Sequence, residues 1–172
     1  MTIFQQLQEA STRGNIEVGR GPLLLKLELR SNPEALCGVR GALGSLVENL
    51  GFPEEESRSI VRAVDEALAN VIRHAYGNHK EKPIEISIRR IEERHAGMQK
   101  EALEILLEDQ GVPIDRKKLK GRELHDVRPG GLGLHFIRES MDAVEFRRSK
   151  GKNQLRLLKY LLVAPPSRGG RV

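Results

Sequence analysis

The sequence is poor in aromatic residues and in cysteine, and it has no long apolar run. Aromatic residues make up 3% of the 172 residues, tryptophan is absent, and Cys37 is the one cysteine. A single cysteine excludes an internal disulfide and any metal site built from several cysteines. No apolar stretch approaches the roughly 20 residues that span a bilayer, and the polar N-terminus lacks the layout of a signal peptide. We therefore expect a cytoplasmic protein with an aliphatic core and no membrane contact.

Charged residues are abundant and of both signs. The chain has 29 Lys and Arg residues and 24 Asp and Glu residues, which gives a formal net charge of +5. The basic excess is concentrated in 116–122 and 147–159. Neither interleaved aromatic residues nor a base-reading motif accompanies these stretches, so direct nucleic-acid binding is disfavoured.

Hydrophobic periodicity predicts the elements and their order. Alternating apolar residues predict five strands, and apolar residues at helical spacing predict three helices. The predicted strands are 23–30, 84–88, 103–107, 144–148 and 155–163, and the predicted helices are 33–50, 53–76 and 131–141. This order predicts an α+β two-layer sandwich with the helices packed on one face of a mixed, mostly antiparallel sheet. We expect one domain over 21–163, after a flexible arm (1–20) and before a disordered tail (164–172).

A first candidate motif lies on the second predicted helix. Glu66 and Asn70 are one helical turn apart, so their carboxylate and amide project together. The amide oxygen of Asn70 suits Mg²⁺, which also keeps waters and phosphate oxygens as ligands. Glu66 could then accept a proton from the group that attacks a terminal phosphate. Arg73 and His74 follow on the same side and either contact phosphate or balance surface charge. The alternative for the whole motif is an ordinary solvated helix face.

A second motif follows the strand that ends near residue 107. Asp109 could accept the exocyclic amine of adenine, and Gly111 would let the base approach the backbone. The alternative is an ordinary turn after a strand, because Asp and Gly are favoured in turns.

A third motif is a glycine-rich turn that opens the last predicted helix, formed by Gly130, Gly131, Leu132, Gly133 and Leu134. Glycines free backbone N–H groups to face phosphate oxygens, and a helix N-terminus adds favourable partial charge. The alternative is a flexible linker before a helix. The chain contains no G-x-x-x-x-G-K-[ST] phosphate loop.

Taken together and in this order, the three motifs resemble those of the GHKL (Bergerat-fold) ATPases. The closer resemblance is to the small bacterial anti-sigma-factor serine/threonine kinases, over about residues 22–163. It implies the histidine-kinase-like ATPase fold and a site for ATP with Mg²⁺. In it Glu66 would be the general base, Asn70 would hold the metal, and Asp109 would bind adenine. The glycines Gly111, Gly131 and Gly133 would shape the phosphate pocket.

The resemblance also implies a lid and shows one departure. The basic segment 114–129 would fold over ATP, with Arg128 as its contact to the phosphates. The family often has Gly-Thr-Thr before its last strand, where a threonine helps to anchor adenine. This chain has Gly151-Lys-Asn-Gln154, so either Asn153 or Gln154 must substitute for that threonine, or adenine binding is weaker.

Three functions remain open on the sequence alone. The first is a serine/threonine protein kinase that phosphorylates a STAS-class antagonist protein and sequesters a sigma factor or a similar regulator. The second is a nucleotide-gated binding module without kinase activity, and the third is a structural or nucleic-acid-binding protein. A general base one turn before the metal ligand favours the kinase. Members of the family are commonly dimers, so a homodimer is a further candidate assembly.

Overall fold

The computed structural model describes residues 21–95, 98–113 and 132–161. Several expected features therefore lie outside the described residues: the arm 1–20, the lid 114–129 with Arg128, the glycines Gly130 and Gly131, and the tail 164–172. The expected domain boundaries stay predictions for the same reason.

Five strands form one sheet in the order β1-β2-β3-β5-β4. Their bounds are Leu23–Arg30 (β1), Pro83–His95 (β2), Met98–Asp109 (β3), Ala143–Ser149 (β4) and Lys152–Tyr160 (β5). All four pairings among these strands are antiparallel. The expected mostly antiparallel sheet is confirmed, and within the described residues it has no parallel pair. The chain returns from β3 through α5 to the edge strand β4, and β5 then pairs antiparallel with both β4 and β3.

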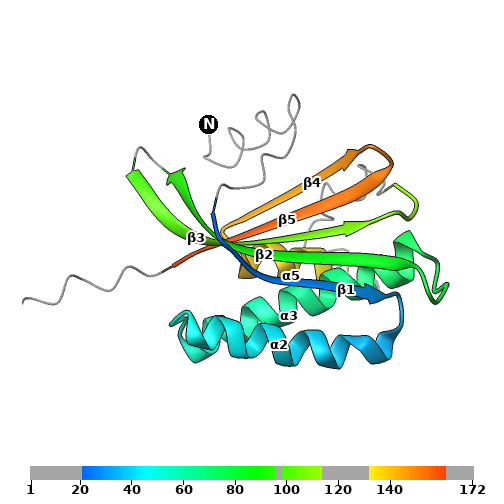
Figure 1. Ribbon diagram of the computed structural model, residues 1–172, viewed down its shortest axis with the longest axis horizontal. Helices are drawn as coiled ribbons and strands as arrows, with labels where there is room; N and C mark the ends of the chain where they lie inside the picture. The colour runs from blue at the N-terminus through cyan, green and yellow to red at the C-terminus, as the bar shows by residue number, and fades with distance from the viewer. Residues whose placement is uncertain (1–20, 96–97, 114–131, 162–172) are drawn as a thin grey trace, which may run out of the picture.

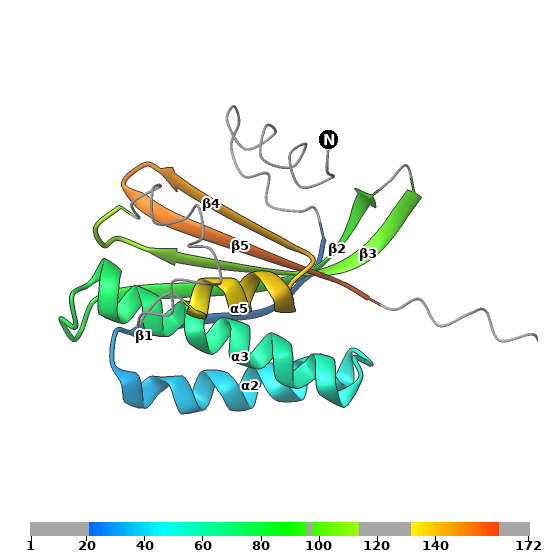
Figure 2. The same ribbon diagram turned by 180° about the vertical axis from the view of Figure 1, so that it is seen from behind.

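The helices cover one face of this sheet (Figures 1 and 2). They are the short 3-10 turn η1 (Pro33–Ala35), α2 (Leu36–Asn49), α3 (Glu54–Asn70), the π-helical turn η2 (Val71–Ala75) and α5 (Leu132–Ser140). Asn32 begins the first helical segment, since its side chain accepts a hydrogen bond from the Glu34 N–H at 3.2 Å. None of the described helices is both long and apolar enough to cross a membrane.

The core lies between the helices and the sheet, as the alternation of apolar residues predicts. Strands β2 and β3 turn every second residue toward the helices, and these aliphatic side chains are fully buried: Ile84, Ile86, Ile88, Leu103, Ile105 and Leu107. The stripes of α2 and α3 pack against them with Leu43, Val47, Ile60, Val64 and Leu68. Each such side chain contributes about 1.5–3 kcal/mol to folding. The two-layer sandwich is therefore confirmed, with an aliphatic core.

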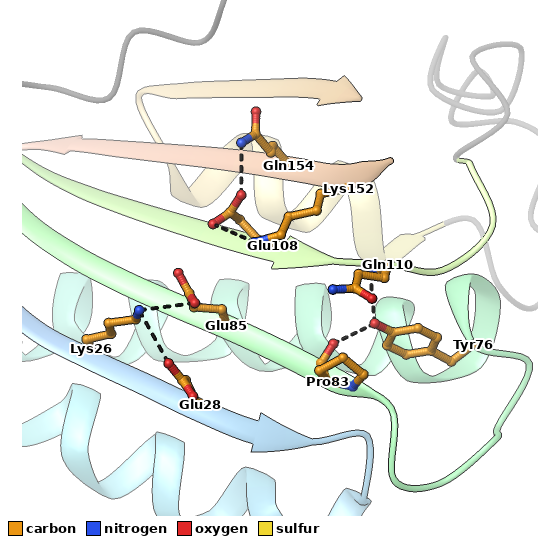
Figure 3. Close-up of polar contacts among 9 residues, drawn as sticks. All are labelled: Lys26, Glu28, Tyr76, Pro83, Glu85, Glu108, Gln110, Lys152 and Gln154. Carbon is orange, nitrogen blue, oxygen red and sulfur yellow. Dashed lines mark hydrogen bonds and ion pairs between the residues drawn. The ribbon is translucent and has the colours of Figure 1, made fainter. Parts of the chain in front are cut away.

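The opposite side of the sheet, here called the far face, carries paired polar residues. Lys26 on β1 contacts Glu28 and Glu85 at 3.3 and 3.1 Å, and Gln154 on β5 donates to Glu108 on β3 at 2.9 Å (Figure 3). These pairs match the period of two along a strand, which turns neighbouring residues to opposite faces. Asp109 directly follows Glu108, and Asn153 directly precedes Gln154. The side chains of Asp109 and Asn153 therefore point to the opposite face of the sheet, toward the helices.

The second predicted helix ends differently from the prediction. The α-helix stops at Asn70, and the next turn is a π-helix in which the Tyr76 N–H donates to the Val71 carbonyl at 3.0 Å. Gly77 and Asn78 then end the helical segment with positive φ angles of 56° and 62°. The wide turn matters because it directly follows the candidate metal ligand, and single π turns occur often at functional sites.

Candidate functional site

One face of α3 borders an open cleft with a volume of about 570 Å³. Glu66 and Asn70 both line it, one helical turn apart, and both are half-buried. Gly133 and Phe136 of α5 form the opposite wall. The structure therefore brings together the expected base, the expected metal ligand and one glycine of the third motif.

Arg73 connects the two functional side chains of α3. Its Nη2 lies 3.2 Å from Glu66 Oε1 and 3.4 Å from Asn70 Oδ1, and its Nε donates to the Ala69 carbonyl at 3.3 Å. A guanidinium carries several donors in one plane, so it can contact both acceptors at once. The sequence left open whether Arg73 meets phosphate or balances charge, and here it balances the charge of Glu66 inside the cleft.

Gly133 has a structural reason to be glycine. A Cβ atom at this position would overlap the Glu66 side chain, with Glu66 Cδ 2.5 Å and Glu66 Cγ 2.8 Å away. Alanine is favoured over glycine inside a helix, so the close approach of α5 to α3 outweighs helix propensity here. The contact makes a flexible linker an insufficient account of this glycine. Leu132 and Leu134 lie beside it in the first turn of α5.

Asp109 ends β3 in a buried setting, with 5% of its surface exposed. Its Oδ1 accepts hydrogen bonds from the Gly111 N–H at 2.8 Å and from Asn153 Nδ2 at 2.7 Å. Burial raises the pKa of this carboxyl above its usual value, while the two hydrogen bonds and the charge of Arg148 partly offset the rise. A buried carboxylate held in this way can accept one further hydrogen bond from a ligand.

Gly111 and Tyr76 join the end of β3 to the helix that carries Glu66. A Cβ on Gly111 would overlap the backbone of Ala75, and the next N–H, of Val112, donates to the Ala75 carbonyl at 2.9 Å. The Tyr76 hydroxyl donates to the Pro83 carbonyl at 2.5 Å and accepts from the Gln110 N–H at 2.8 Å (Figure 3). The Asp109 turn is thus fixed against the residues that follow Asn70.

Asn153 is the residue that stands beside Asp109, and Gln154 is not. Asn153 pairs with Asp109 across β3 and β5 and is 3% exposed. Gln154 points to the far face, where it contacts Glu108 (Figure 3). The alternation of Leu155 and Leu157 with Asn153 on the core face was the signal that could have separated the two candidates.

The structure places the expected residues in two groups. Glu66, Asn70 and Gly133 line the cleft, whereas Asp109 and Gly111 form a second group at the end of β3, beyond η2. Within the described residues no three Asp, Glu, His or Cys side chains are close enough to hold a metal ion by themselves.

Comparisons with known proteins agree with this arrangement. A family model described as the histidine kinase-like ATPase domain matches residues 29–159. The serine-protein kinase RsbW of Oceanobacillus iheyensis is 26% identical over 145 residues, covering 80% of this chain and 86% of that protein. RsbW of Bacillus velezensis is 27% identical over 146 residues, covering 80% of this chain and 85% of that protein.

Two solved structures share the fold at 15% identity. The SiaB-SiaC complex from Pseudomonas aeruginosa matches with a TM-score of 0.53 over 94% of this chain and 99% of that chain. The RsbU and RsbW domains of a Mycobacterium tuberculosis protein match with a TM-score of 0.52 over 78% of this chain and 32% of that chain. Together with the family match, these likenesses confirm the resemblance to the GHKL ATPases. The chain belongs to the family of histidine kinase-like ATPase domains.

Proposed function

We propose that the protein binds ATP and transfers its terminal phosphoryl group to a serine or threonine hydroxyl of a partner protein. The observation that carries this proposal is the pairing of Glu66 and Asn70 in one cleft, with Gly133 packed against Glu66. Family membership supports ATP as the nucleotide. The relatives named serine-protein kinases support the reaction.

The residues of the cleft fit a magnesium ion held mainly by the nucleotide. Mg²⁺ usually takes one or two protein oxygens and fills its other positions with water and phosphate oxygens. Asn70 Oδ1 is such an oxygen, and the absence of a three-carboxylate cluster among the described residues suits this arrangement. When bound, the ion would neutralise charge on the phosphates. Asn70 would hold it, and Gly130 and Gly131 are proposed to contribute backbone N–H groups to the phosphates.

We assign the role of general base to Glu66. Its carboxylate accepts the proton of the acceptor hydroxyl while that oxygen bonds to the terminal phosphorus. The bond from this phosphorus to the bridging oxygen breaks, and ADP leaves with the electron pair. Gly133 keeps the carboxylate in place by close contact. Arg73 must exchange its contact with Glu66 for another anion, and the phosphates supply one.

Asp109 and Gly111 are proposed to bind adenine, and Arg128 is proposed to reach the phosphates from the segment 114–129. The partner is proposed to be a STAS-class antagonist protein, with a sigma factor or similar regulator as a second partner. The names of the relatives support this class, and SiaB was crystallised in a complex with SiaC. We propose that one domain over 21–163 carries these activities, and that it assembles as a homodimer.

The test is phosphotransfer from labelled ATP to purified STAS-domain proteins encoded beside this gene. The Glu66→Ala variant should lose about 10²–10⁴-fold in rate, as expected for a lost acid–base group, and should keep its affinity for ADP. Asp65→Ala is the matched control, because Asp65 lines the same cleft and is paired with Arg40 at 2.8 Å. Transfer by Glu66→Ala at the wild-type rate would contradict the assignment.

A nucleotide-gated binding module is the second candidate function. The ion pair between Arg73 and Glu66 favours it, because a carboxylate oxygen that already accepts from a guanidinium is less free to accept the proton of a hydroxyl group. In that case the wild-type protein would bind its partner only with ATP and would never label it.

A further inference from the structure

We propose that Asn153 and Arg148 are positioning residues that make Asp109 select a purine with an amino group at C6. This inference rests on the proposed nucleotide site. Asn153 and Arg148 lie outside the three motifs. With Asp109 of the second motif they form a row of side chains on three neighbouring strands, and this row would distinguish an amine from a carbonyl at C6.

Strand register places the three side chains in a row. Asn153 on β5 lies opposite Asp109 on β3 and opposite Arg148 on β4. Arg148 Nη1 donates to Asn153 Oδ1 at 2.7 Å, and Asn153 Nδ2 donates to Asp109 Oδ1 at 2.7 Å. The row thus runs from an exposed cation through a buried amide to a buried carboxylate.

Arg148 determines which way the Asn153 amide points. A guanidinium has donors and no acceptor, so it binds the amide oxygen and leaves the amide nitrogen for the other side. That nitrogen meets acceptors only: Asp109 Oδ1, the Val112 carbonyl at 3.1 Å and the Gly111 carbonyl at 3.4 Å. The reversed amide would place its oxygen among three oxygens, so the chemistry of its neighbours excludes it.

The fixed amide leaves Asp109 with one acceptor for a ligand. Oδ1 is occupied by Asn153 and by the Gly111 N–H, whereas Oδ2 meets no hydrogen-bond donor among the described residues. An amino group at C6 of a purine donates to this oxygen. A carbonyl at C6 would bring a second acceptor against it, and a buried site rejects a ligand that leaves its polar groups unpaired.

Arg148 also closes the turn that would lie against the base. The same Nη1 donates to the Gly111 carbonyl at 3.0 Å, and Gly111 in turn donates to Asp109. The cation and the two donors favour the ionised carboxyl against the effect of burial, which raises its pKa. An ionised Asp109 can accept a hydrogen bond and cannot donate one, which is the property that selectivity requires.

The experiment compares the binding of ADP and inosine diphosphate, with Mg²⁺, by calorimetry. Inosine diphosphate carries a carbonyl at C6, and the wild-type protein should prefer ADP by at least about 100-fold. Asn153→Ala should weaken ADP by about 10-fold, leave inosine diphosphate unchanged, and so lower the preference. Arg148→Ala should act in the same direction by about threefold, because this side chain is exposed and its charge is screened.

Gln154→Ala is the matched control. It removes an amide of the same strand that pairs with Glu108 at 2.9 Å on the far face (Figure 3), and it should leave both affinities unchanged. Asn153→Asp tests the same idea if the alanine variant does not fold. Two neighbouring carboxyls share a proton, which can be donated to a C6 carbonyl, so the preference for ADP should fall.

Two results would overturn the inference while leaving ATP binding intact. One is wild-type ADP affinity in Asn153→Ala. The other is an equal loss for both nucleotides in the Asn153 variants, which would mean that the residue supports the turn and does not read the base. Failure of the wild-type protein to bind ADP at all would instead refute the proposed function.

Discussion

Replacing Gly133 with alanine should stop phosphotransfer and leave the fold intact. The new Cβ would overlap the Glu66 carboxylate and lie 2.8 Å from Glu66 Cγ, so the Glu66 side chain must turn away. It has room to do so, because 31% of this side chain is exposed beside an open cleft. The backbones of α3 and α5 should therefore keep their positions, whereas the Glu66 carboxylate is displaced from its position in the cleft.

The two expected effects differ greatly in size. A displaced base should cost about 10²–10⁴-fold in transfer rate. The free energy of unfolding should change little, because alanine gains at most about 1 kcal/mol over glycine in a helix and Gly133 lies in the first turn of α5. Loss of the contact between Glu66 and Arg73 removes at most about 1 kcal/mol, since this ion pair is exposed. These contributions oppose each other, and their sum lies within about 1 kcal/mol of zero.

Urea unfolding and single-turnover transfer from labelled ATP measure the two effects separately. Gly41→Ala is the matched control, because this glycine lies in α2 and a Cβ there would meet nothing within 4 Å. It should stabilise the protein by about 1 kcal/mol and leave transfer unchanged. A Gly133→Ala protein with the wild-type transfer rate would refute the argument. Destabilisation by several kcal/mol would show that Glu66 cannot move aside.

Much of the fold could be predicted because burial imposes a period on the sequence. Alternating apolar residues, mostly leucines and isoleucines, predict which face of the strands lies on the core, and Asn32 followed by Pro33 marks the start of a helix. The π turn η2 was not predicted, because a change from i−4 to i−5 hydrogen bonding has no residue signature. Its C-terminal end contacts the Asp109 turn, where the Val112 N–H donates to the Ala75 carbonyl at 2.9 Å.

The candidate site could be predicted only within single elements. Glu66 and Asn70 follow from helical spacing, and Arg73 lies about 20° from Glu66 on a helical wheel. The contact of Gly133 with Glu66 joins residues far apart in sequence, so spacing could not reveal it. The pairing of Asn153 with Asp109 depends on the strand register between β3 and β5. The alternation of apolar residues predicts that both side chains lie on the same face of the sheet, but it does not predict the register.

Three further predictions concern the support of the site and the sheet. Tyr76→Phe removes both hydroxyl hydrogen bonds and should cost about 1–3 kcal/mol in urea unfolding. Glu104→Ala removes the most buried partner of Arg156, at 2.6 Å, while Glu93 and Glu145 remain at 3.1 and 3.4 Å. It should therefore cost less than the roughly 3–5 kcal/mol of a buried charge that loses every partner, whereas Lys26→Ala, on the exposed surface, should have little effect on stability. The last prediction uses the raised pKa of Asp109. A carboxyl whose pKa is higher in the folded protein binds protons more tightly there, so its contribution to stability falls as the pH rises above 3.8. The wild-type protein should therefore lose stability relative to Asp109→Asn between pH 4 and 7, as measured by urea unfolding at each pH. A difference that stays constant over this range would show that burial does not perturb this carboxyl.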